Sequence, residues 1–168
     1  MAAKYWNAGA SLRRCKRRVG WPLRYGRQLR RMRWTQSLLS IVPITELCVA
    51  DHKHDAHEID AWLSNKTVEA WSKWVARNDA VLLVAIRDKT IVGVGMATFR
   101  GEILLNYVHP DARYSGVSKA LLAAMEEELR SHDATHCQLE TTNTARRFYE
   151  KRGFEQDREN ASILLKCL

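Results

Sequence analysis

The sequence predicts an α+β domain in which a mixed β-sheet carries helices on its faces. Three observations predict this class. Apolar runs of strand length alternate with segments whose apolar residues recur every three or four positions, as on one face of a helix. The chain has 168 residues, which is enough for one substantial core. No apolar run is as long as the roughly 18 residues of a membrane-spanning helix.

Positive charge is concentrated near the N-terminus. Residues 1–45 contain 11 of the 27 Lys and Arg residues and none of the 19 acidic residues. We therefore divide the chain into a basic extension, residues 1–36, and a domain, residues 37–168. The extension can be an arm that binds nucleic acid, an organellar transit peptide or a partly disordered segment. The nearest candidate for a first strand, which would be degenerate, is Val19–Tyr25, and Pro22 weakens it.

The first part of the domain is predicted to be helical. Ser37–Val49 is a candidate helix, and Thr67 is expected to cap another that runs to Val75. The polar segment 51–58 contains three histidines, but no Cys pair and no His-Glu-x-x-His pattern accompanies them. We therefore favour a solvated loop or helix start over a metal site.

A β-hairpin follows. Val81–Ile86 and Thr90–Phe99 are predicted to be strands joined by a turn at residues 87–89. Gly93 and Gly95 lie inside the second strand, where glycine often marks the close approach of another part of the chain. The later strands of the sheet are predicted at Cys137–Thr141 and Ala161–Cys167.

The stretch from Glu102 to Leu129 carries the strongest functional signal. Ile103–Val108 is an apolar run of strand length, and Lys119–Leu129 has the apolar spacing of a helix. Between them, Arg113–Ser118 is a short basic loop with one glycine. The N-terminus of a helix carries unpaired N–H groups and about half a positive charge. This arrangement favours the capture of a phosphate or pyrophosphate, although an ordinary strand-to-helix connection has the same pattern.

A second motif lies at Thr142–Phe154. Asn143 or Thr144 can cap a helix of about ten residues, and Gly153 stands where the end of a helix favours a left-handed residue. The nucleotide-binding patterns Gly-x-x-x-x-Gly-Lys-Ser/Thr and Gly-x-Gly-x-x-Gly are both missing from the sequence.

The two motifs together resemble the GNAT superfamily of N-acetyltransferases, over roughly residues 46–168. In that family an Arg/Gln-x-x-Gly-x-Gly/Ala loop binds the pyrophosphate of acetyl-CoA. A later helix ending in Tyr-x-x-x-Gly-Phe supplies a tyrosine that protonates the departing CoA thiolate. Here the loop is Arg113–Ser118 and the helix ends with Tyr149–Phe154. Ser118 departs from the usual Gly or Ala, and Thr142 stands where an asparagine is frequent.

The resemblance implies a GNAT-like acyl-CoA N-acyltransferase fold with acetyl-CoA as co-substrate and an amine as acceptor. It implies that Tyr149 is the general acid, because a phenol of pKa about 10 can protonate a thiolate of pKa about 8.5. A core tyrosine is the alternative interpretation. Glu102 is our first candidate for a base, ahead of His109, Asp51 and His52, and a dedicated base can also be unnecessary.

The resemblance also implies the residues that bind the cofactor. The central strand is expected to part from its neighbour after Asn106, so that the Val108 backbone can pair with the pantetheine arm. A backbone N–H near Tyr107 or Val108 would polarise the thioester. The implied set is Tyr107, Val108, Arg113, Tyr114, Ser115, Gly116, Val117, Ser118, Lys119 and Asn143.

The acceptor is expected to lie under the helices that precede the hairpin. Trp62, Trp71 and Trp74 are therefore either core residues or pocket wall, and we expect one of them to face the substrate. Acidic residues and a histidine near this region would suit a cationic amine; they are Asp51, His52, Asp55, Glu58 and Glu102.

Two functions stay open at this stage. The first is an acetyl-CoA-dependent N-acetyltransferase that moves an acetyl group to a primary amine by direct attack. The second is a catalytically idle GNAT-shaped module that docks on nucleic acid or protein through residues 1–36. The Tyr149 motif and the phosphate loop favour the first. A homodimer is plausible, and no membrane partner is expected.

The four cysteines show neither close pairing nor metal spacing. Reduced thiols in a cytoplasm are the simplest interpretation, and no metal is predicted. We expect Cys137 and Cys167 to be buried, because both fall in apolar strands.

Overall fold

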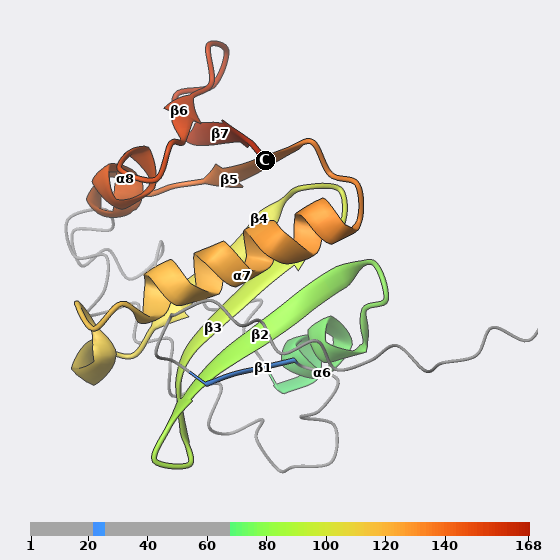
Figure 1. Ribbon diagram of the computed structural model, residues 1–168, viewed down its shortest axis with the longest axis vertical. Coiled ribbons are helices and arrows are strands. Elements are labelled where there is room, and N and C mark those ends of the chain that lie inside the picture. The colour runs from blue at the N-terminus through green and yellow to red at the C-terminus, as the bar shows by residue number, and fades with distance from the viewer. Residues whose placement is uncertain (1–21, 26–67) are drawn as a thin grey trace, which may run out of the picture.

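The computed structural model describes residues 22–25 and 68–168 (Figure 1). Several predictions lie outside the described residues: most of the basic extension, the helix at Ser37–Val49, the polar segment 51–58 and the cap at Thr67. The side chains of Trp62 and Trp71 also lie outside them.

The described elements confirm the predicted α+β class and the predicted order of strands and helices. Two short strands, β1 and β6, add to that order, and β1 lies within the candidate first strand Val19–Tyr25. In sequence the elements are β1 (Leu23–Tyr25), α6 (Val68–Ala76), β2 (Ala80–Arg87), β3 (Thr90–Thr98), β4 (Ile103–Val108), the 3₁₀ helix η1 (Pro110–Ala112), α7 (Val117–Ser131), β5 (His136–Glu140), α8 (Asn143–Glu150), β6 (Glu155–Gln156) and β7 (Ile163–Cys167).

The strands form two antiparallel sheets. One has the order β1-β2-β3-β4 and the other the order β5-β7-β6. A parallel bridge between Glu102 and Gln138 joins them where β4 and β5 begin. Among the described strands, parallel pairing therefore occurs at this junction, and the other pairs are antiparallel. The two strands part directly beyond it, which corrects the expectation that they part only after Asn106.

The first sheet is covered on both faces. Alternate residues of β2 point to opposite sides, since side chains in a strand have a period of two. Val81, Leu83 and Ala85 pack with α7, whereas Leu82 and Val84 belong to a second cluster that Trp74 of α6 contacts. Figure 1 shows α7 lying across the first sheet, and the second sheet and α8 lie beyond the β4 edge of that sheet. Trp74 thus contributes to a core cluster.

The two glycines of β3 allow α7 to lie directly on the strand. A Cβ atom on Gly93 would lie 2.6 Å from Val117 Cγ1, and one on Gly95 would lie 3.1 Å from Met125 Sδ. Both positions face α7, so the predicted close approach is confirmed. Because Val117 is the first residue of α7, Gly93 sets where that helix begins.

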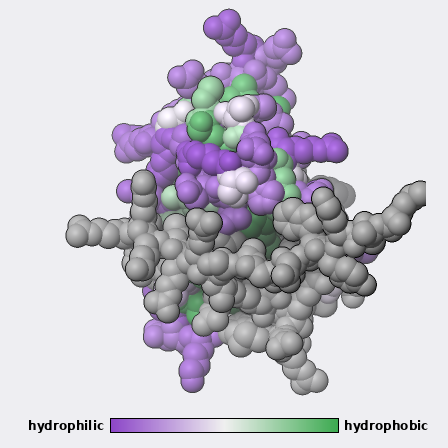
Figure 2. Space-filling model, turned by 45° about the vertical axis from the view of Figure 1, so that its right-hand side comes forward, coloured by the Kyte–Doolittle hydropathy of each residue, from purple (hydrophilic) through white to green (hydrophobic). Residues whose placement is uncertain are grey.

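The described residues that can be seen in Figure 2 are mostly polar, with hydrophobic residues in small patches. Among the described residues, no helix is long and apolar enough to cross a membrane. Cys137 is buried, as expected, and burial raises the pKa of its thiol to about 12. Cys167 is exposed, which corrects the prediction. It lies at the end of β7, the middle strand of the second sheet, where alternation turns its side chain outward.

We predict that Gly93→Ala destabilises the fold more than Gly95→Ala. The new methyl group on residue 93 meets the Val117 side chain at 2.6 Å and the Tyr107 carbonyl oxygen at 3.1 Å, so α7 or the strand must shift. Overpacking of this kind costs about 1–3 kcal/mol. At residue 95 the neighbour is the flexible Met125, and the expected loss is below about 1 kcal/mol. Urea unfolding of both variants measures the difference, and equal losses would contradict it.

Candidate functional site

A cavity of about 550 Å³ opens where β4 and β5 part. Its walls come from β4, the loop that follows, the first turn of α7, the end of β5 and one side of α8. The volume is typical of sites for small molecules and cofactors. The structure brings nine of the predicted site residues to this cavity: Tyr107, Val108, Arg113, Tyr114, Gly116, Val117, Ser118, Lys119 and Tyr149.

Three predicted residues do not line the cavity. The Ser115 hydroxyl donates to the Ala112 carbonyl oxygen and so braces the loop from within. Asn143 is the first residue of α8 and is exposed. Glu102 lies at the junction of the two sheets.

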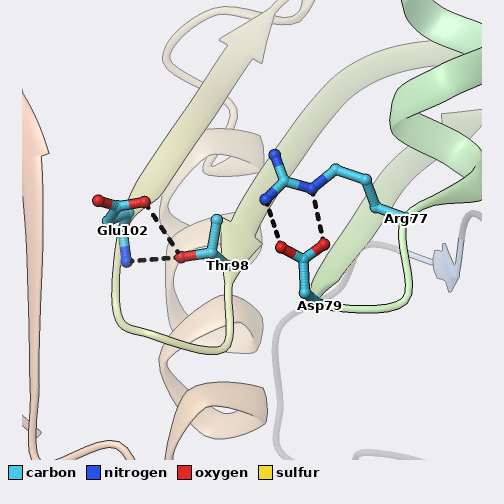
Figure 3. A network of polar contacts seen from close by, with 4 residues as sticks. All are labelled: Arg77, Asp79, Thr98 and Glu102. Carbon is cyan, nitrogen blue, oxygen red and sulfur yellow. Dashed lines mark hydrogen bonds and ion pairs between the residues drawn. The ribbon is translucent and has the colours of Figure 1, made fainter.

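Glu102 is held in the tight turn between β3 and β4 (Figure 3). Its backbone N–H donates to the Thr98 hydroxyl at 3.2 Å, and that hydroxyl lies 3.5 Å from the Glu102 carboxylate. Beside them, Arg77 forms a two-pronged ion pair with Asp79. Glu102 is exposed and therefore belongs to a polar surface cluster at this end of the sheet.

The loop before α7 has the backbone that an anion site requires. Tyr114 and Gly116 both adopt positive φ angles, 58° and 89°. Gly116 is the residue at the helix N-cap, and no side chain caps the helix there. The first N–H groups of α7 therefore have no partner within the helix. Both the Nε and one terminal nitrogen of Arg113 are buried without a hydrogen-bond partner. The loop thus presents several free donors to the cavity.

The edge of β4 that faces β5 offers further donors. His109 donates its backbone N–H to the Val92 carbonyl oxygen of the neighbouring β3 at 2.9 Å. In an antiparallel pair the direction of the backbone groups alternates, so the N–H of Val108 points to the opposite edge. The predicted pairing position of Val108 is therefore on the cavity side, whereas the Tyr107 carbonyl faces β3.

Helix α8 carries Tyr149 to the opposite wall. The helix is capped by Thr142, whose hydroxyl accepts from the Ala145 N–H at 3.4 Å, which corrects the assignment of the cap to Asn143 or Thr144. It ends in a Schellman arrangement: Phe154 N–H donates to the Tyr149 carbonyl oxygen, and Gly153 N–H donates to that of Glu150. Gly153 has a φ of 83°, as predicted.

Tyr149 is buried in an aromatic cluster. Its ring meets Phe148 and Phe154 edge to face, with centroids 4.9 Å and 5.6 Å away. Burial raises the pKa of its phenol to about 12, while the nearby Asn106 amide and the Arg152 guanidinium counteract part of this increase. The phenol therefore keeps its proton throughout the neutral range.

The predicted site leaves out several polar residues that line the same cavity, and two of them, Asn106 and Arg152, have buried nitrogen atoms without a hydrogen-bond partner. Arg152 lies over the Phe148 ring at 3.6 Å and donates to the Phe148 carbonyl oxygen at 2.6 Å. Burial lowers the pKa of its guanidinium. Each residue had a signal: Asn106 is the only polar residue of the apolar run 103–108, and Arg152 follows Tyr149 by three residues.

Among the described residues, no group of three or more His, Cys, Asp and Glu side chains is arranged to hold a metal ion. Three of the side chains that line the cavity are basic, namely Arg113, Lys119 and Arg152, against one carboxylate, Glu140. Such a lining suits an anionic ligand.

Comparisons with known proteins agree with this geometry. The model of the acetyltransferase (GNAT) domain family matches residues 49–162. A comparison with curated protein sequences finds no significant match.

Solved structures share the fold at low sequence identity. The PaiA N-acetyltransferase from Thermoplasma acidophilum, crystallised in complex with coenzyme A, is 19% identical with a TM-score of 0.73, over 89% of this chain and 100% of that one. A GCN5-related N-acetyltransferase from Rhodopseudomonas palustris is 18% identical with a TM-score of 0.71, over 88% of this chain and 96% of that one.

We predict that the stability of the protein falls between pH 10 and pH 12, in part because of Tyr149. Below pH 10 the phenol is protonated in the folded and unfolded states alike. Above it, the unfolded chain releases the proton, whereas the folded protein retains it up to a pKa of about 12. Unfolding becomes easier over this interval, by roughly 2–3 kcal/mol at its end.

Urea unfolding at several alkaline pH values, for the wild type and for Tyr149→Phe, isolates this contribution. The variant should lose less stability over the interval. Tyrosinate absorbance measured on both proteins should show the difference between them titrating near pH 12, and a difference that titrates near pH 10 would refute the assignment.

Proposed function

The chain belongs to the GNAT acetyltransferase family, and from this we propose that it transfers the acetyl group of acetyl-CoA to a primary amine. The observation that supports the proposal most strongly is the set of donors at one end of the cavity. The uncapped N-terminus of α7 lies there, together with two nitrogen atoms of Arg113 that have no hydrogen-bond partner. Backbone donors and a fixed cation together suit the pyrophosphate of a CoA molecule.

The rest of the cavity suits the pantetheine arm and the thioester. The unpaired edge of β4 offers the Val108 N–H to an extended chain of amide groups, as a neighbouring strand would pair with it. In the proposed reaction, this N–H polarises the thioester carbonyl. The amine nitrogen then attacks the carbonyl carbon directly.

Tyr149 completes the proposed reaction as the general acid. A carbon–nitrogen bond forms, the carbon–sulfur bond breaks, and the thiolate takes the phenol proton. The proton that the amine loses restores the phenol through solvent. The phenol, with a pKa of about 12, is a weaker acid than a free thiol of pKa about 8.5. The transfer can still proceed, because burial beside Tyr149 also disfavours the charged thiolate.

Glu102 stays a prediction as the general base. It does not line the cavity that contains Tyr149, and its carboxylate lies beside the Thr98 hydroxyl. The proposal does not depend on it, because the free-base fraction of an amine in solution can supply the nucleophile. The acceptor, a homodimer and the role of the basic extension stay predictions.

The first test is calorimetric titration with acetyl-CoA, with ATP and NAD as controls. Micromolar binding of acetyl-CoA alone is expected, followed by CoA release when amines are added. A folded protein that binds none of the three would overturn the proposal.

We predict that Tyr149→Phe lowers kcat about a hundredfold and leaves the Kd for acetyl-CoA nearly unchanged. The change removes the proton donor and retains the ring that packs in the aromatic cluster. Steady-state kinetics and calorimetry measure the two quantities. An unchanged kcat would show that another group protonates the thiolate.

We predict that Gly116→Val weakens acetyl-CoA binding at least about tenfold, whereas Gly153→Val does not. Both glycines have positive φ angles, 89° and 83°, so both variants carry similar backbone strain. Gly116 lines the cavity and Gly153 does not. Calorimetry compares the affinities, with thermal unfolding as a check that both proteins fold. Equal affinities for the two variants would place the pyrophosphate elsewhere.

A further inference from the structure

In the described part of the chain, the buried side-chain polar atoms that lack a partner all belong to residues that line the cavity. Within residues 22–25 and 68–168, the buried side-chain nitrogen and oxygen atoms without a hydrogen bond belong to Asn106, Arg113 and Arg152. All three residues line the cavity. The Arg113 atoms are explained by a phosphate ligand. Arg152 is partly satisfied by its bond to the Phe148 carbonyl oxygen and by its contact with the Phe148 ring. Asn106 has no such explanation.

Asn106 is an unusual residue for its position. It lies in the middle of β4, between apolar neighbours, and both its Nδ2 and its Oδ1 are buried without a partner. A buried amide that makes no hydrogen bond destabilises a fold. It therefore does not serve to hold the strand in place. A polar group at such a site indicates a role in binding or catalysis, when a ligand occupies the cavity.

The group on which Asn106 can act is the Tyr149 phenol. The two residues line the same cavity from facing elements, β4 and α8. The Asn106 amide is close enough to counteract part of the effect of burial on the Tyr149 phenol, and it is the largest group that does so, ahead of Arg152. The Asn106 amide and the Tyr149 phenol are within hydrogen-bonding reach, but the Asn106 atoms do not meet the geometry of a full hydrogen bond in this structure, and catalytic hydrogen bonds commonly tighten only in the reacting complex.

We propose that Asn106 is a positioning residue for Tyr149, and that its side-chain N–H donates a hydrogen bond to the Tyr149 oxygen as the phenol gives up its proton. The inference rests on the proposed function, since it assumes that Tyr149 is the acid. In the step, the phenol O–H bond breaks and the thiol S–H bond forms. The negative charge left on the phenol oxygen is then met by the amide N–H.

The chemistry favours an amide for this task. A buried phenol is a poor acid because its charged form lacks solvent, so a preorganised donor at the oxygen lowers the barrier where the charge develops. The amide is neutral and adds no charge that would disturb the thioester. The same N–H also fixes which way the phenol hydroxyl points, because the oxygen accepts from Asn106 and donates towards the sulfur.

The first variant to test is Asn106→Leu, which has a similar volume and no polar atoms. We expect kcat to fall about tenfold, with the Kd for acetyl-CoA within about twofold of the wild type. We also expect the variant to unfold at an equal or higher urea concentration, because an unsatisfied buried amide has been removed. An unchanged kcat, or a loss of stability large enough to explain the loss of activity, would overturn the proposal.

The matched control is Asn106→Asp, which keeps the shape and both heavy-atom positions but has no N–H donor when ionised. If donation to Tyr149 is the task, this variant loses at least as much kcat as Asn106→Leu. If it retains the wild-type kcat, then shape or an acceptor oxygen is what matters and the proposal is wrong.

A double-mutant cycle with Tyr149→Phe separates this inference from the proposed function. Asn106→Leu should have no further effect on kcat in the Tyr149→Phe background, because the group that it serves is gone. If the losses multiply, Asn106 acts independently of Tyr149 and the inference fails. If Tyr149→Phe alone leaves kcat intact, the proposed acid is wrong. If only Tyr149→Phe is impaired, the acid stands and the role of Asn106 is refuted.

Discussion

The parting of β4 from β5 is the constraint on which the site depends. The two strands share one bridge at Glu102 and Gln138 and then separate, so that one edge of β4 runs along a cavity instead of a neighbouring strand. Backbone groups that are buried need partners, and an unpaired strand edge inside a domain is therefore a binding surface by its nature. The same separation leaves room for the side chains of α8 to face β4.

The parting is maintained by packing on either side of it. Glycines in β3 bring α7 down onto the first sheet, which fixes the position of its N-terminus. On the other side, Glu126 of α7 forms a partly buried ion pair with Lys166 of β7 at 2.7 Å. Lys166 also lies over the ring of Phe154, which packs against Tyr149. The ion pair thus links α7, whose N-terminus offers donors to an anion, to the second sheet, which lies beside the aromatic cluster of Tyr149.

Local patterns predicted most of the fold, and non-local pairing accounts for most of what they missed. Apolar periodicity located β2, β3, β4 and α7, and the left-handed glycine at residue 153 followed from helix-end chemistry. The division into two sheets could not be predicted, because it depends on which strands meet across many residues of sequence. The cap at Thr142 lies one residue before the predicted position, and Cys167 points to the outer face of its strand; a local pattern does not resolve a shift of one residue. Asn106 was visible as one polar residue in an apolar run, but only the structure shows that α8 faces it.

The positions of the unsatisfied groups also indicate which end of the cavity a ligand meets first. Arg113 and the first turn of α7 are at the start of the helix, and Tyr114 beside them is fully exposed, so this end meets solvent first. Asn106 and Tyr149 are buried deeper, where β4 faces α8. A ligand whose anionic end is held by the loop would therefore be placed with its other end between the amide and the phenol. Lys119 and the start of α7 attract the anionic end of the ligand, and the neutral donors act where burial strengthens each hydrogen bond.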